Sequence, residues 1–189
     1  MGPAAAAAIP VPTLEGERCV LRALRIEDAA SLARHADNAA VWRNLFEGFP
    51  RPYTLADAQA WCDATRRSAR VGFVWGIEVA GNEGREVAGC IGLRPDAGWL
   101  RCNAEIGYWL GEAHWRRGIV TEAAVRVTAW AWATQPEITR IYAPIFGWNE
   151  GSQRVAKKAG YALEANLPQS AIKSGRLIDR VQYAAYRVR

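Results

Sequence analysis

The pattern of apolar and polar residues changes period in the middle of the chain. From Asn103 to Leu110, apolar side chains alternate with polar or small ones, which predicts the core of a strand that begins near Leu100. From Ile119 to Thr134, apolar residues recur at helical spacing, which predicts a helix. Between these elements, the residues Trp115-Arg116-Arg117-Gly118 predict a short basic loop directly before the helix.

A strand, a basic glycine loop and a helix N-terminus can together hold a phosphate group. The first N–H groups of a helix have no intrahelical acceptor, and the helix dipole is positive there. Gly118 would let the backbone approach a ligand closely, and Arg116 and Arg117 could add charge-assisted hydrogen bonds. The same residues also fit a solvated basic turn that binds nothing. Nucleoside-triphosphate and dinucleotide loops are excluded, because Gly118 is the only glycine between Gly111 and Gly147.

The rest of the pattern predicts an α+β protein with a mixed sheet. Before the central segment we expect a strand at residues 18–23 and three helices, which begin at residue 26 and span residues 38–45 and 54–68. A hairpin of two strands, at residues 71–79 and 86–93, should follow. After it we expect a strand, a helix and two strands, at residues 140–146, 149–160, 161–166 and 179–187. The alanine-rich residues 1–12 predict a flexible lead-in to a single domain over residues 13–189.

Two parts of the sequence resemble known motifs. Glu105-Ile-Gly-Tyr-Trp-Leu110, followed by Trp115–Ala123, resembles the acetyl-CoA-binding motif of the GNAT N-acetyltransferases. Asn149-Glu-Gly-Ser152 and the segment after it resemble the Asn-x-x-Ser helix of one branch, which contains the ribosomal-protein N-terminal acetyltransferases. The chain departs from the family pattern at Trp115, where a polar residue is often found, and at Val120, where a small one is usual.

The resemblance implies the GNAT fold, a mixed central sheet of about six to seven strands with helices on both faces. It also implies a bulge near Gly107 that splays two parallel strands and admits the pantetheine arm of the cofactor. Acetyl-CoA is the implied co-substrate, and no metal is implied. The implied cofactor-binding residues are Trp109 and Leu110 through their backbone, Arg116, Arg117, Gly118, Ile119, Val120 and Thr121 around the pyrophosphate, and Asn149 and Ser152.

The same resemblance places a catalytic base at Glu105 and a group that contacts the sulfur at Ser152. The alternative for Glu105 is an ion pair between a strand-face carboxylate and an arginine. The alternative for Ser152 and Asn149 is that they satisfy backbone groups at the start of their helix. We expect direct acetyl transfer, because no cysteine or serine has a visible activating neighbour in the sequence.

The acceptor is an amine whose identity the sequence leaves open: a protein N-terminus, a polyamine, an amino acid or an aminoglycoside-like amine. Trp42, Phe49 and Tyr53 could line its pocket, although ordinary core packing explains them equally well. Two other functions stay open, a GNAT-fold module that binds acyl-CoA without turnover, and a basic ribosome- or RNA-associated protein.

Composition narrows these choices. The net charge of +5 suits an anionic cofactor, but the arginines are scattered, so nucleic acid is not expected as the principal ligand. Four cysteines without short spacing and two histidines argue against a zinc site and predict small buried thiols. No segment has transmembrane length and the N-terminus lacks a secretory pattern, which predicts a cytoplasmic protein. The nine tryptophans leave a homodimer open.

Overall fold

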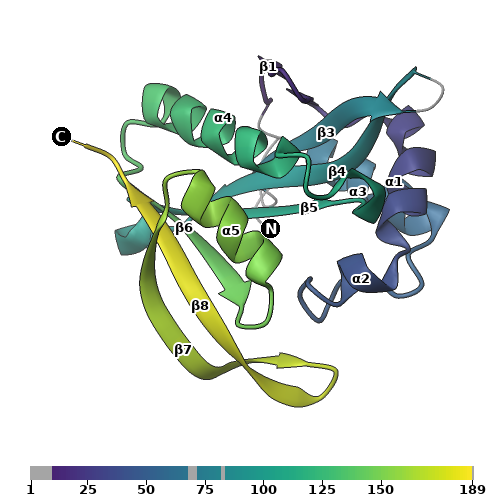
Figure 1. Cartoon of the computed structure of the whole chain (residues 1–189). Helices are drawn as coiled ribbons and strands as arrows, with labels where there is room; N and C mark the ends of the chain where they lie inside the picture. Colours follow the sequence, from purple (N-terminus) through teal and green to yellow (C-terminus); the bar gives the residue numbers. More distant parts are fainter. Residues whose placement is uncertain (1–9, 68–71, 82–83, 189) are drawn as a thin grey trace, which may run out of the picture.

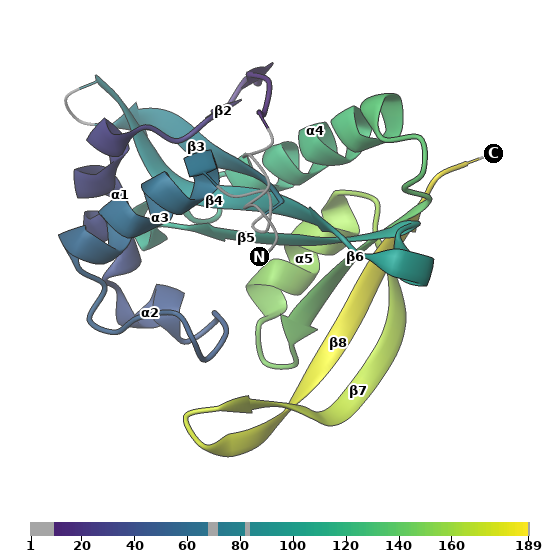
Figure 2. The same ribbon diagram turned by 180° about the vertical axis from the view of Figure 1, so that it is seen from behind.

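The computed structural model describes residues 10–67, 72–81 and 84–188. These residues form an eight-stranded sheet in the order β1-β2-β3-β4-β5-β6-β8-β7 (Figures 1 and 2). The strands are β1 (Leu14–Glu15), β2 (Val20–Arg22), β3 (Phe73–Gly81), β4 (Gly84–Pro95), β5 (Asn103–Leu110), β6 (Arg140–Phe146), β7 (Ala162–Lys173) and β8 (Arg176–Tyr186). The helices are α1 (Ala29–Ala36), α2 (Ala39–Trp42), α3 (Leu55–Arg67), α4 (Ile119–Thr134) and α5 (Glu150–Lys158).

Helices cover both faces of the sheet, which confirms the expected α+β fold. On one face, α4 and α5 pack over a core that includes Trp75, Ile106 and Val127. On the other face, α1 and α3 enclose a second core around Leu32 and Cys62 (Figure 2). The alternation along each strand separates the two cores, since successive side chains point to opposite faces.

The helix predicted at residues 119–134 and the strand predicted at residues 140–146 are observed with the same bounds, as α4 and β6. The predicted strand from Leu100 starts later, because residues 98–100 form a 3-10 turn before β5. The largest error concerns β7, which continues to Lys173 instead of ending at residue 166. Its outer half pairs with β8 but is little buried, so no apolar alternation marks it. With β1, which the sequence pattern did not predict, the sheet has eight strands instead of the expected six to seven.

Parts of three other predictions lie outside the described residues. They are residues 1–9 of the expected lead-in and the ends of the segments predicted at 54–68 and 71–79. Within the described part of that lead-in, Val11 packs against the core and the Pro12 carbonyl accepts a 2.8 Å hydrogen bond from Trp75 Nε1. Three cysteines are buried as expected, but Cys102 is exposed because it lies in the turn before β5.

The strands β5 and β6 form the parallel pair of the sheet, and they stay together only briefly. Pairing joins Asn103–Glu105 to Arg140–Tyr142 and stops there. The expected bulge at Gly107 is absent, because β4 and β5 pair in continuous register from Ala104 to Leu110. Beyond Glu105, the β6 side of β5 therefore has no strand partner, and this opening positions the candidate site.

A polar cluster joins the three strands β6, β8 and β7. The Glu164 carboxylate accepts hydrogen bonds from Arg140, with 2.7 Å to Nε, from Gln182 at 2.6 Å and from the Tyr186 hydroxyl. The Arg140 guanidinium and these other donors lower the pKa of Glu164 from 4.5 to about 2. The cluster therefore stabilises the C-terminal strands while Glu164 is ionised.

We predict that Glu164→Gln lowers the free energy of unfolding by about 1–3 kcal/mol at neutral pH, because it removes the charge that these donors share. The folded pKa lies below the unfolded value, so the stabilisation is present above about pH 4.5 and disappears as the pH falls toward 2. Denaturant titrations should therefore show that the difference in the free energy of unfolding between wild type and variant becomes smaller as the pH is lowered from 6 to 3. Glu150→Gln, which removes an exposed i,i+4 pair with Arg154, serves as a control with little effect. A constant difference at all pH values would contradict the assignment.

Candidate active site

The loop before α4 presents free donors to solvent. Arg116 and Gly118 have φ angles of 62° and 75°, so the backbone turns sharply and no side chain caps the helix. The first intrahelical hydrogen bond runs from the Glu122 N–H to the Gly118 carbonyl at 3.0 Å, which leaves the N–H groups of residues 119–121 without acceptors in the described structure. Arg116 and Arg117 are exposed and form no ion pair with any described residue. The site has the donors and the charge that a pyrophosphate requires.

Trp115 fixes this loop to the end of β5. Its indole Nε1 donates a 2.7 Å hydrogen bond to the Leu110 carbonyl. The residue that departs from the family pattern thus has a structural role here. The same bond occupies one of the two lone pairs of the Leu110 carbonyl, a residue that the resemblance assigns to the pantetheine arm.

Glu105 lies at the point where β5 and β6 separate. Its Oε2 accepts a 2.6 Å hydrogen bond from Arg94 on the neighbouring strand, and its side chain is 29% exposed. The ion pair that was the alternative interpretation is therefore present, but it engages one carboxylate oxygen. No described residue donates to Oε1. Two residues further along the same strand face, Gly107 faces open space, since a Cβ added there would meet no atom within 4 Å.

Asn149 and Ser152 begin α5, beside the opening between the strands. The Asn149 side chain accepts a 3.1 Å hydrogen bond from the Ser152 N–H and so caps the helix. The Ser152 carbonyl accepts from the Tyr108 hydroxyl at 3.2 Å, whereas the Ser152 hydroxyl has no partner among the described residues. Burial raises the pKa of Tyr108 to about 12, so its hydroxyl stays protonated. Asn149 has the structural role, and Ser152 retains a free hydroxyl.

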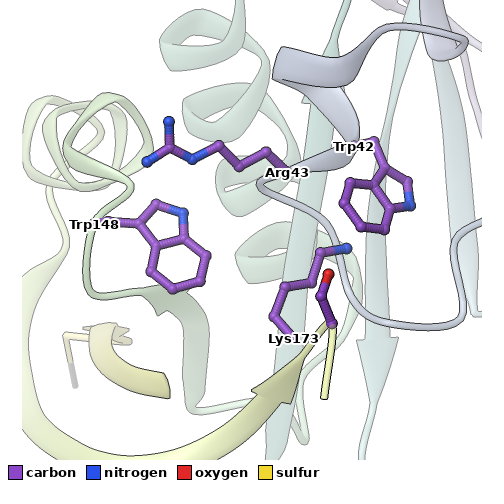
Figure 3. Close-up of a pocket in the computed structure, with 5 residues that line it drawn as sticks. Trp42, Arg43, Trp148 and Lys173 are labelled. Atoms are coloured by element: carbon purple, nitrogen blue, oxygen red, sulfur yellow. The ribbon is translucent and has the colours of Figure 1, made fainter. Parts of the chain in front are cut away.

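The three aromatic residues proposed for an acceptor pocket divide into two groups. Tyr53 is buried and stacks on Phe49 with ring centroids 4.8 Å apart, and Phe49 contacts Trp109 at 6.1 Å. These rings form part of the core on the α1 and α3 face. Trp42 instead lines a cavity of about 220 Å³ together with Arg43, Trp148, Lys173 and Ser174 (Figure 3).

Comparison with known protein families identifies the family of this chain. The acetyltransferase (GNAT) domain family matches residues 18–162, which is most of the sequence. The chain belongs to the GNAT acetyltransferase family. This confirms the expected class of enzyme, the fold and acetyl-CoA as the acyl donor, and the exposed helix N-terminus of α4 is where the family resemblance expects that donor.

Individual relatives of this GNAT acetyltransferase agree with the assignment. The N-acetyltransferase YoaA of Bacillus subtilis, named as uncharacterized, is 29% identical over 180 residues, 94% of this chain and 98% of the relative. The structure of Mycobacterium smegmatis RimJ in complex with CoA-disulfide matches with a TM-score of 0.74 and 26% identity, over 89% of this chain and 81% of that one. The ribosomal-protein-S5-alanine acetyltransferase from Vibrio fischeri matches with a TM-score of 0.77 and 16% identity, over 93% and 97%. The neighbours support the likeness to the ribosomal-protein branch.

Sequence reasoning missed four residues of the cavity: Arg43, Trp148, Lys173 and Ser174. They come from the turn after α2, the β6–α5 loop and the tip of the β7–β8 hairpin, which meet only in the folded protein. Trp148, directly before the Asn149–Ser152 motif, was the one available signal. None of the helices in the described part of this GNAT acetyltransferase combines the length and apolar character of a membrane span.

The two histidines, which are far apart in sequence, lie together beside the loop. His35 Nε2 is 3.2 Å and His114 Nε2 is 3.8 Å from Glu86 Oε1, and the potential ligand atoms of the three residues lie within 4.8 Å of one another. Sequence spacing gave no sign of this group. Glu86 also pairs with Arg34, and burial lowers the pKa of His114, with nearby His35 and Arg117 adding to the effect. Because Arg34 and both imidazoles contact the Glu86 carboxylate, the group links α1, β4 and the loop.

We predict that Asn149→Ala lowers the free energy of unfolding by about 1 kcal/mol, because it removes the side-chain acceptor at the start of α5. Asn149→Asp keeps an acceptor in the same place and should leave stability within about 0.5 kcal/mol of wild type. Denaturant unfolding of both variants measures this difference. Equal destabilisation by alanine and aspartate would argue against the capping role.

Proposed function

We propose that this GNAT acetyltransferase transfers the acetyl group of acetyl-CoA directly to a primary amine, with Glu105 as the general base. The amine belongs to a protein N-terminus or to a small molecule. One observation carries the proposal: the carboxylate of Glu105, with one free oxygen, lies where β5 and β6 separate and next to open space at Gly107.

The cofactor would lie along this opening. Arg116, Arg117 and the free N–H groups of residues 119–121 would bind the pyrophosphate, with Gly118 allowing close approach. The pantetheine arm would use backbone groups of β5 around Trp109 that have no partner on the β6 side. Asn149 would position Ser152 by capping α5, so that the free serine hydroxyl faces the thioester end of the arm.

Amide formation needs a base, a site for the oxyanion and stabilisation of the thiolate. Glu105 Oε1 would accept the proton of the attacking amine, directly or through a water molecule, while Arg94 orients the carboxylate through Oε2. The nitrogen attacks the thioester carbonyl carbon, and a backbone N–H of β5 beyond Glu105 would hold the oxyanion. The carbon–sulfur bond then breaks, and the hydroxyl of Ser152 would donate a hydrogen bond to the leaving thiolate.

The thiols of the chain support direct transfer over a covalent acyl-enzyme. Burial raises the pKa of Cys90 to about 12 and that of Cys19 and Cys62 to about 11. A thiol must ionise to act as a nucleophile, so these three are inert at neutral pH. The fourth cysteine, Cys102, is exposed and lies in the turn before β5, three residues before Glu105 in the chain.

We predict that Glu105→Gln lowers kcat by about a hundredfold or more, because glutamine cannot accept the proton of the amine. The affinity for acetyl-CoA should stay within about twofold, since the substitution keeps shape and lies away from the arginine loop. Steady-state release of free CoA with a reactive amine, and calorimetric titration with acetyl-CoA, measure the two quantities.

The matched control for this variant is Glu137→Gln, which removes a largely exposed carboxylate paired with Arg101 and should leave kcat unchanged. Full activity of Glu105→Gln would remove the base role. Acetyl-CoA binding by a wild-type protein that acetylates no amine would favour the non-catalytic acyl-CoA module instead.

We further predict that acetyl-CoA, at about a hundred times its dissociation constant, stabilises the protein by roughly 2.7 kcal/mol in a thermal-shift titration, whereas ATP and NAD do not. Replacing Arg116 and Arg117 together by alanine should weaken acetyl-CoA binding by about tenfold or more, because two charge-assisted contacts are lost. The exposed pair Arg66 and Arg67 on α3, replaced in the same way, controls for the change in net charge.

Two results of that titration would point elsewhere. If millimolar acetyl-CoA gave no shift, the proposed cofactor site would be wrong. If RNA bound with an affinity that falls steeply with salt while acetyl-CoA did not bind, the ribosome- or RNA-associated function would replace this proposal.

A further inference from the structure

The cavity between α2, the β6–α5 loop and the β7–β8 hairpin has two aromatic walls and two cationic ones. In Figure 3, the indoles of Trp42 and Trp148 lie on opposite sides, with Arg43 on a third side and Lys173 on the fourth. The volume of about 220 Å³ can hold a small ligand group. Trp148 Nε1 donates a 3.3 Å hydrogen bond to Asn44 Oδ1, which ties its wall of the cavity to the segment after α2.

Lys173 is the unusual member of this group. The residue is 6% exposed, and its buried ammonium has no hydrogen-bond acceptor in the described structure. Its Nζ lies 3.5 Å from the centroid of the Trp42 ring, and this cation–π contact offsets part of the cost of burial. A buried cation without an anionic partner is otherwise expensive, so the site as it stands lacks a negative charge.

The surrounding charges add to this imbalance. Arg51 also contacts the Trp42 ring, with its Cζ 4.9 Å from the centroid, and Arg43 is exposed at the cavity. The negative charge of Glu47 acts on Lys173, but Glu47 accepts a hydrogen bond from the Ser174 N–H at 2.8 Å and forms no ion pair with Lys173 within 4.0 Å. The region around the cavity therefore holds three cations, Lys173, Arg43 and Arg51, and one carboxylate, that of Glu47.

The cavity is connected to the proposed reaction centre on two sides. Trp148 directly precedes the Asn149 cap and lies four residues before Ser152 in the chain. On the opposite side, Trp42 Nε1 donates to the Phe49 carbonyl at 3.0 Å, and the Phe49 ring contacts Trp109, which shares a strand face with Glu105. A molecule seated in the cavity would therefore lie beside the opening where the amine has to react.

We infer that this cavity is an acceptor subsite for a carboxylate or phosphate group, so that the enzyme selects amines that carry such an anion. Arg43, which is exposed at the cavity, contacts the anion, and the ammonium of Lys173 attracts it from its buried position against the Trp42 ring. The indoles of Trp42 and Trp148 pack against the atoms that join the anion to the amine. The inference rests on the proposed function, because it takes the reacting amine to lie at Glu105.

Matched pairs of amines test the inference, because the members of each pair differ in the anion alone. Phosphoethanolamine is compared with ethanolamine, and the dipeptide amide Ala-Glu with Ala-Gln. The wild-type enzyme should use the anionic member of at least one pair with a kcat/KM about tenfold or more above that of the neutral member. The first pair reports a phosphate-bearing small molecule and the second an acidic peptide N-terminus.

Lys173→Met removes the charge and keeps the length of the side chain, and should reduce the preference for the anion to about twofold or less. Lys173→Arg should keep most of it. Lys158→Met, on the exposed surface of α5, controls for net charge and should leave the preference unchanged. Because an apolar side chain replaces an unpaired buried cation, Lys173→Met is expected to fold, and its melting temperature checks this.

Equal use of both members of both pairs by the wild type would overturn the inference, as would a preference that survives in Lys173→Met. If acetyl-CoA binds but no amine reacts, the proposed function fails. The quenching of tryptophan fluorescence by phosphoethanolamine or the Ala-Glu amide, measured with CoA present, then decides about the cavity. Saturable quenching that Lys173→Met abolishes would support an anion site, and its absence in the wild type would refute one.

Discussion

The active region of this enzyme depends on the short pairing between β5 and β6. Parallel strands normally share hydrogen bonds along their length, yet these two separate after Glu105. Backbone polar groups on that side of β5 then need another partner, which in the proposed function is the pantetheine arm. On the α4 and α5 face, Ala143 of β6 and Ala156 of α5 lie with Tyr108 and Tyr161 in apolar packing between the elements. In the proposed function, the separation makes one side of β5, in the interior of the sheet, a binding surface.

Charge is arranged unequally around this opening. The free arginines and helix N–H groups lie beyond one end of β5, where the proposed pyrophosphate site is, and Lys173 with Arg43 lies across from it at the cavity. Glu105, oriented by Arg94, lies on β5 at the point where this strand separates from β6. The net charge of +5 thus includes cations gathered at the two regions that the proposals assign to anionic groups.

Local pattern was sufficient for the elements that hold the cofactor loop. The helical period fixed α4 and alternation fixed most of β5, because both elements bury one face in the same core. The likeness of Glu105–Leu110 and Trp115–Ala123 to a known motif then supplied the family. The Arg94–Glu105 contact could be named only as one of many arginine pairings, since cross-strand register decides which arginine it is.

The parts that escaped prediction depend on contacts between distant segments. Lys173 lies beyond the strand predicted at residues 161–166, and nothing in the sequence marks it as buried against Trp42. His35 and His114 come from an N-terminal helix and the cofactor loop, and only the packing of α1 against β4 brings them to Glu86. In each case the hairpin or helix can be predicted, but the element against which it packs cannot. Contacts between side chains of distant elements produce no repeating pattern in the sequence.

The bond between Trp115 and Leu110 has a consequence for how a ligand meets this enzyme. A loop with two left-handed residues would ordinarily sample many conformations and would lose that freedom when a ligand arrives. Here an indole anchored on the last residue of β5 restrains the loop in advance. Less conformational entropy is then lost on association, so more of the interaction energy remains as affinity. If the loop binds the cofactor as proposed, the bulky tryptophan, a departure in sequence, makes it a preorganised receptor.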